Sequence, residues 1–251
     1  MASKLIPLDQ KKLEYFLIIL LIIGSLNFVL VSVDLAGYPY DIDYSEGFVL
    51  EDTSRLMSTG SLYPEPSLQN GFESVKYPPL YYIVLGLIGS IANISFLTGR
   101  ILNIAAFGGI FGLIYFFIRE RGYSANYVPL ILLIPYLTLF TTLTLRTDIL
   151  ALFLSFFGLY IFERNKIHAS AVALALAFLT KQIFIAGFGA VNLYILYHTD
   201  LKKLFNRLKE FELEKILKEN SQLWKFNLTY VLGLLVSIAI ILIWNPYFLQ
   251  N

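Results

Sequence analysis

Eight apolar runs constrain the fold of this chain more than any other feature of its sequence. They cover residues 15–33, 80–94, 97–118, 128–145, 149–162, 167–180, 183–197 and 228–244. The longer runs approach the roughly 20 residues that cross a bilayer as a helix, and backbone groups in lipid must pair within their own segment. Charged residues make up only 15% of the chain, against roughly 25% in soluble domains. We therefore expect an all-α, polytopic membrane protein.

Positive charge predicts the topology, because Lys and Arg in short loops favour the cytoplasm. If run 80–94 dips into the membrane from outside without crossing, the basic residues of 119–121, 164–166 and 201–225 all face the cytoplasm. This layout gives about seven transmembrane helices with a cytoplasmic N-terminus. We expect one module, 1–251, in the plasma membrane, with a first outer loop at 34–77 and a cytoplasmic amphipathic segment at 200–226.

The outer loop 34–77 is strongly acidic, with eight Asp and Glu against Arg55 and Lys76. Within it, apolar spacing predicts an amphipathic helix over 45–59 that stops at Gly60. Asp43 followed by Glu46 has the spacing of a capping box at the start of that helix. The same two carboxylates, three residues apart on one face, are also candidates for a general base or a metal ligand. The spacing alone leaves these interpretations open.

Other charged residues lie at the same predicted side of the membrane. Lys76 precedes Pro78 and Pro79; it is either an interfacial lysine in an aromatic belt or a cation that holds a lipid phosphate. Arg146 and Asp148 have the spacing of a local ion pair at a helix start. Lys181 and Gln182 split an apolar hairpin, where a charge costs about 2.5–3.5 kcal/mol. We therefore expect Asp43, Glu46, Lys76, Arg146 and Lys181 to gather around one hollow.

Ordered motifs in the chain resemble a known family. Five segments, taken in order, resemble the N-terminal half of a GT-C superfamily integral-membrane glycosyltransferase. They are Asp43–Leu50, Leu62–Pro64, Tyr77–Tyr82, Arg146–Leu152 and Phe178–Gln182. The resemblance is to the group related to protein O-mannosyltransferases and lipid A aminoarabinose transferases. Such enzymes continue with further spans beyond the position of Trp244–Asn251. We therefore expect this chain to be a fragment of such an enzyme, a minimal version of it, or one subunit whose partner supplies the further spans.

The resemblance implies transfer of a sugar from a polyprenyl-phosphate donor to a glycan, lipid or protein acceptor on the extracytoplasmic face. It implies that Asp43 or Glu46 is the catalytic acid or base; Ser45 stands where relatives carry the first acid of a pair, so either carboxylate fits. Lys76 matches a lysine that would hold the donor phosphate. Arg146 and Lys181 are added as phosphate partners, and Asp148, Tyr77 and Gln182 as supporting residues.

Two other functions are weighed against this one. A non-catalytic membrane subunit would bind lipid phosphate, or hold a partner, without turnover. A small transporter or channel is disfavoured because the inner halves of the runs, apart from Arg100, lack polar residues, and no internal duplication is found. No cofactor is required by the pattern, although carboxylates could bind a divalent metal. The partners expected are the lipid-linked sugar, its acceptor and membrane lipid, and no nucleic acid.

Overall fold

The computed structural model describes residues 10–65, 74–123, 142–199 and 220–250, and the described elements are helical. The α-helices are α1 (Gln10–Gly37), α2 (Tyr44–Thr59), α3 (Leu80–Ala92), α4 (Phe96–Glu120), α5 (Asp148–Glu163), α6 (Ile167–Thr180), α7 (Ile185–Tyr197) and α10 (Ser221–Trp244). Two short 3-10 helices, η3 (Gln182–Phe184) and η4 (Pro246–Leu249), precede α7 and follow α10. The expected all-α class is confirmed for this part of the chain.

Three described helices are long and apolar enough to cross a membrane: α1 over Tyr15–Gly37, α4 and α10. This finding indicates a membrane protein. Helices α5, α6 and α7 contain 16, 14 and 13 residues, roughly 20–24 Å of helix at 1.5 Å per residue, and are not among these three. The expectation of seven crossings is therefore not confirmed.

Two predicted segments differ from the structure at their ends. Run 128–145 lies largely outside the described residues, and its last part, 142–145, is buried and non-helical. The predicted cytoplasmic segment 200–226 also lies largely outside them. However, α10 already begins at Ser221, so the end of that segment belongs to a long apolar helix.

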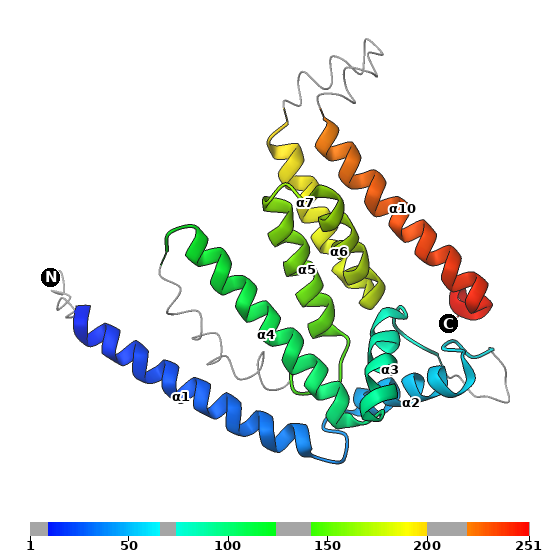
Figure 1. Cartoon of the computed structure of the whole chain (residues 1–251), viewed down its shortest axis with the longest axis horizontal. Coiled ribbons are helices and arrows are strands. Elements are labelled where there is room, and N and C mark those ends of the chain that lie inside the picture. Colours follow the sequence, from blue (N-terminus) through cyan, green and yellow to red (C-terminus); the bar gives the residue numbers. More distant parts are fainter. Residues whose placement is uncertain (1–9, 66–73, 124–141, 200–219, 251) are drawn as a thin grey trace, which may run out of the picture.

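Helix α6 lies at the centre of the packing, between α5 and α10 (Figure 1). Its buried face is built from small residues and leucine, which allow neighbouring backbones to approach closely. A Cβ at Gly158 of α5 would lie 2.7 Å from Leu174 Cγ. Ser170 Oγ donates to the Gly158 carbonyl over 2.8 Å. The α5–α6 pair is therefore in close contact at Gly158, where any larger side chain would have to displace Leu174.

Helix α2 has the boundaries that the sequence predicts. The Asp43 side chain accepts from the backbone N–H of Ser45, and the capping box with Glu46 is present. At the other end, Gly60 adopts φ 74° and donates to the Leu56 carbonyl. A left-handed residue at this position closes the last turn at little steric cost only when it is glycine.

The C-terminal end of α10 lies beside the segment that follows α2 (Figure 1). The Asn245 side-chain amide is 3.0 Å from Ser61 Oγ, and the rings of Tyr63 and Phe248 have centroids 5.0 Å apart. Residues Asn245–Leu249 therefore lie against the segment that follows α2.

Candidate functional site

Four charged side chains form a continuous row between α2, α5 and the end of α6. Arg146 Nη1 lies 3.4 Å from Asp43 Oδ2, and Arg146 Nε lies 3.4 Å from Asp148 Oδ2. Lys181 Nζ then lies 2.5 Å from Asp148 Oδ1. We call Asp43, Arg146, Asp148 and Lys181 the charged row. Residues more than a hundred positions apart in sequence thus meet at one site, alternating in charge.

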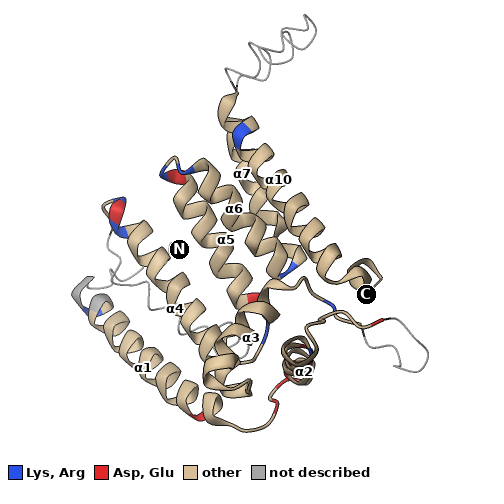
Figure 2. Ribbon diagram, turned by 45° about the vertical axis from the view of Figure 1, so that its right-hand side comes forward, with Lys and Arg blue, Asp and Glu red and all other residues tan. Residues whose placement is uncertain are grey.

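The fold places each member of the row at the end of an element. Asp43 is the N-cap of α2, and Asp148 is the first residue of α5. Arg146 lies just before α5, and Lys181 directly follows α6. A carboxylate in the first turn of a helix is favoured by the helix dipole. In Figure 2 the charged positions of α5 lie at its two ends, and a further basic and acidic pair lies at the C-terminal end of α4.

The loop residues Lys76 and Tyr77 lie beside this row. Gln182 Nε2 donates to the Lys76 carbonyl over 3.2 Å, and Lys181 Nζ lies 5.0 Å from the Tyr77 ring centroid. The Lys76 ammonium lies 5.8 Å from the centroid of the Phe48 ring on α2. The expected meeting of Asp43, Arg146 and Lys181 is therefore present in the structure. Lys76 approaches this region through its backbone, and its ammonium lies over Phe48 rather than against the row.

The row is partly open to its surroundings. The Asp43 and Lys181 side chains are 11% and 16% exposed, and those of Arg146 and Asp148 are 30% and 31% exposed. The Ser45 hydroxyl donates to Asp43 Oδ1, and this bond, together with the nearby Arg146 charge, lowers the pKa of Asp43 below its ordinary value. Asp43 is therefore an ionised carboxylate at neutral pH, in contact with a guanidinium that a ligand can also reach.

Glu46 does not join this row, and the expectation that it faces the hollow is wrong. Its side chain is fully buried, and Arg100 of α4 donates to both of its carboxylate oxygens over 3.0 and 2.8 Å. Burial raises the pKa of Glu46. The hydrogen bonds from Arg100 and from the backbone N–H groups of Ile42 and Leu145 outweigh this effect, so the pKa lies below its ordinary value. Glu46 is therefore held as a buried carboxylate that is paired with Arg100.

Sequence reasoning missed Arg100 and Asn103 as residues that build the site. Both side chains are fully buried. Asn103 Nδ2 donates to the carbonyls of Thr144 and Arg146, and Asn103 Oδ1 accepts from the Tyr81 hydroxyl. The signal available was Arg100 itself, because an arginine inside an apolar helix requires a partner. The sequence could not say which of the loop acids that partner was.

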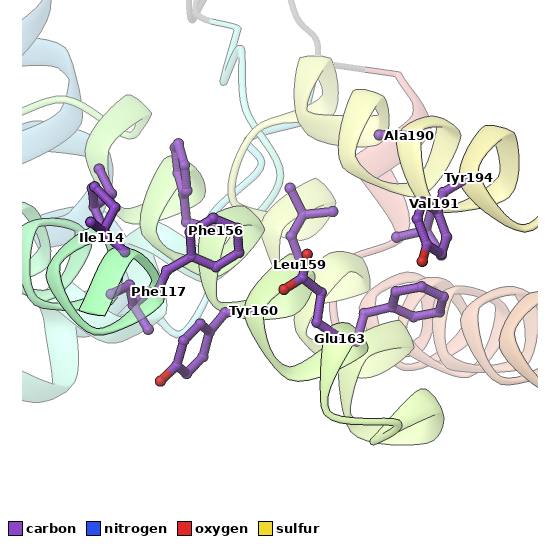
Figure 3. A pocket seen from close by; sticks show the side chains of 12 residues that line it. Ile114, Phe117, Phe156, Leu159, Tyr160, Glu163, Ala190, Val191 and Tyr194 are labelled. Atoms are coloured by element: carbon purple, nitrogen blue, oxygen red, sulfur yellow. The ribbon is translucent and has the colours of Figure 1, made fainter. Parts of the chain in front are cut away.

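A separate apolar cavity lies toward the opposite end of α5 (Figure 3). It has a volume of about 540 Å³ and is lined by α4, α5 and α7, with Phe117, Phe156 and Tyr194 among its side chains. It contains no member of the charged row. The ion pairs Arg121–Glu163 and Arg164–Glu120 join α4 and α5 at this end of the two helices.

Among the residues that the structure describes, no group of three or more His, Asp or Glu side chains could hold a metal ion. Instead, Asp43 and Asp148 each contact a cationic side chain of the row. Comparison of the chain with family models, with curated proteins and with solved structures found no match.

Proposed function

We propose that this protein is a membrane glycosyltransferase module of GT-C type. It would transfer a sugar from a polyprenyl-phosphate donor to a glycan, lipid or protein acceptor at the outer face of the plasma membrane. The observation that carries the proposal is the contact of the partly exposed, ionised Asp43 with Arg146, in a row that ends at Lys181. A base and phosphate-binding cations are the groups that this reaction needs within one site.

The proposed topology has about seven crossings and a cytoplasmic N-terminus. Its support is the distribution of basic residues outside the row. Arg121 and Arg164 lie at the ends of α4 and α5 opposite to the row, where they pair with Glu163 and Glu120. Because arginine in short loops favours the cytoplasm, this end of the bundle is assigned inside and the charged row outside.

The reaction step assigns a different task to each charge. The acceptor hydroxyl oxygen forms a bond to the anomeric carbon of the sugar while the bond from that carbon to the phosphate oxygen breaks. The hydroxyl proton passes to Asp43. The departing polyprenyl phosphate gains one negative charge, so Arg146, Lys181 and Lys76 stabilise it more in the transition state than in the bound donor.

The low pKa of Asp43 determines when its proton transfer occurs. An ionised carboxylate is ready to accept a proton at neutral pH, but it is a weak base. Transfer to Asp43 is therefore expected late, when the forming bond has made the hydroxyl proton acidic. A phosphate that enters the row would also draw Arg146 from Asp43, which would raise the basicity of that carboxylate.

A second candidate is a non-catalytic subunit that binds lipid phosphate or holds a partner. One observation favours it: Glu46, one of the two acids expected in the reaction, is buried against Arg100. Only Asp43 of that pair lies in the charged row. Such a subunit would use Lys76, Arg146 and Lys181 for the phosphate and would release no product.

The test uses the purified chain in lipid nanodiscs with a panel of polyprenyl-phosphate sugars, and measures release of polyprenyl phosphate. Asp43→Asn should abolish release while expression and folding stay unchanged. Glu51→Gln is the matched control, because Glu51 is an exposed acid of the same helix, outside the row. Full release from Asp43→Asn removes Asp43 from the reaction. Binding of the lipid without release from any donor supports the second candidate.

A further inference from the structure

Glu46 joins the two backbone segments that carry Asp43 and Arg146. One carboxylate oxygen accepts from the backbone N–H of Ile42 over 2.6 Å and of Asp43 over 3.4 Å. The other accepts from the backbone N–H of Leu145 over 2.6 Å. Leu145 directly precedes Arg146, so one buried side chain holds the N-cap of α2 against residues 144–146, which we call the arginine segment.

Arg100 fixes Glu46 in turn and uses its remaining donors on a third segment. Its Nη1 donates to the carbonyls of Leu35 and Tyr38 over 2.9 and 2.5 Å, and its Nη2 donates to the Tyr40 carbonyl over 2.7 Å. The planar guanidinium therefore binds the Glu46 carboxylate on one side and the chain leaving α1 on the other. Both side chains are fully buried, which makes this geometry expensive to change.

Asn103, one turn further along α4, holds the arginine segment from its carbonyl side. Its Nδ2 donates to the carbonyls of Thr144 and Arg146 over 2.6 and 3.0 Å. At Gly99 the helix approaches this segment so closely that a Cβ would lie 2.3 Å from Leu145 Cδ1. The backbone around Arg146 is therefore held by Asn103 of α4 at the carbonyls of Thr144 and Arg146, and by Glu46 of α2 at the N–H of Leu145.

We propose that Arg100, Glu46 and Asn103 are positioning residues that set the separation between Asp43 and Arg146. The Asp43–Arg146 contact is itself long and partly exposed, so it contributes little to holding its own geometry. The buried contacts, in contrast, fix the backbone on both sides of it. This inference rests on the proposed function only in naming Asp43 and Arg146 as the reacting site; the spatial claim stands by itself.

The chain contains no cysteine, which makes a proximity measurement direct. Asp43→Cys and Arg146→Cys are introduced together, and a short bifunctional thiol reagent cross-links them in the full chain in nanodiscs. These substitutions also remove the Asp43–Arg146 contact, so the remaining proximity reports the buried contacts alone. The yield is compared in the otherwise unchanged chain, with Asn103→Ala and with Arg100→Lys.

Asn192→Ala is the matched control, because Asn192 accepts from Asn227 over 2.7 Å between α7 and α10, away from the charged row. We expect the cross-link yield to fall several-fold with Asn103→Ala and Arg100→Lys and to stay unchanged with Asn192→Ala. An undiminished yield with Asn103→Ala overturns the inference. Asn103→Ala leaves no buried charge unpaired. Its cross-link yield therefore tests the inference even if Arg100→Lys does not give folded protein.

A second measurement separates positioning from mere stability. In a chain with Asp43 and Arg146 intact, Asn103→Ala should lower kcat for sugar transfer about 100-fold, as misplacement by about 1 Å does. Asn192→Ala should leave kcat unchanged, and equal losses from both variants would contradict a positioning role. If no variant transfers sugar but the cross-link yields follow the expected order, the proposed function fails and the positioning inference stands.

Discussion

Replacing Glu46 with alanine would leave the Arg100 guanidinium buried without its counter-charge. Arg100 would still donate hydrogen bonds to the carbonyls of Leu35, Tyr38 and Tyr40. These neutral acceptors do not balance its charge. Arginine keeps its proton in proteins, so it cannot escape the penalty by becoming neutral. The folded state alone carries this cost, because the unfolded chain exposes Arg100 to water.

The expected loss is about 3–5 kcal/mol in the free energy of unfolding, the range for breaking a buried pair by removing one partner. The Arg100–Glu46 pair is fully buried, since both side chains are 0% exposed. The Arg121–Glu163 pair offers a matched comparison: it is also 2.8 Å long, but both side chains are 46% exposed. An exposed pair of this kind contributes about 0–1 kcal/mol.

The assay is thermal unfolding in detergent, followed by tryptophan fluorescence, for Glu46→Ala and Glu163→Ala. For a chain of this length, about 1 kcal/mol shifts Tm by roughly 2–4 °C. Glu46→Ala should therefore lower Tm by roughly 6–20 °C, and Glu163→Ala by less than about 4 °C. A similar shift in the two variants would refute the reasoning, because burial is the main property that distinguishes the pairs.

The pH dependence of stability gives an independent check on the same residue. Because the folded-state pKa of Glu46 lies below its ordinary value of 4.5, the unfolded chain binds this proton more readily. The contribution of Glu46 is complete above 4.5 and is lost as pH falls through the lower, folded-state pKa. Glu46→Gln should flatten this part of the stability profile, and an unchanged profile would show that Glu46 is not the group that titrates.

Two further predictions address the start and the end of α2. Ser45→Ala removes the hydroxyl that contributes most to the low pKa of Asp43, so the acid limb of the pH–rate profile for sugar transfer should move to higher pH; an unmoved limb would exclude Asp43 as the titrating base. Gly60→Ala should cost roughly 1 kcal/mol because its φ is 74°. Gly37→Ala, whose Cβ meets nothing within 4 Å, should be neutral or slightly stabilising in the same denaturation assay; equal losses would contradict the conformational argument.

Three members of the charged row were predictable because they are charged residues at the ends of short apolar segments. Lys181 interrupts an apolar hairpin, and Arg146 and Asp148 stand at the start of a short apolar helix. Charges in such places are costly unless they find partners. That cost marks the residues, and the shared side of the membrane brings them together. The pairing of each carboxylate with a particular cation depends on side-chain distances of a few ångströms. Residue spacing in the sequence does not determine those distances.

Glu46 shows where local reasoning stops. The capping box was readable from its spacing to Asp43 and is present. However, the same carboxylate also accepts from Arg100, 54 positions away, and from Leu145, 99 positions away. A sequence pattern describes neighbours along one helix. Burial depends on the elements that cover that helix. Glu46, which was expected to react, is therefore buried in the interior.

The sequence by itself determined the helical class, the membrane environment and the boundaries of α2, because hydrophobic period, length and capping act over a few residues. Only the tertiary structure decided that Asp43 lies in the charged row while Glu46 lies beneath it against Arg100. The physical reason is that burial and charge pairing are set by contacts between segments distant along the chain, whereas propensity is set within each one.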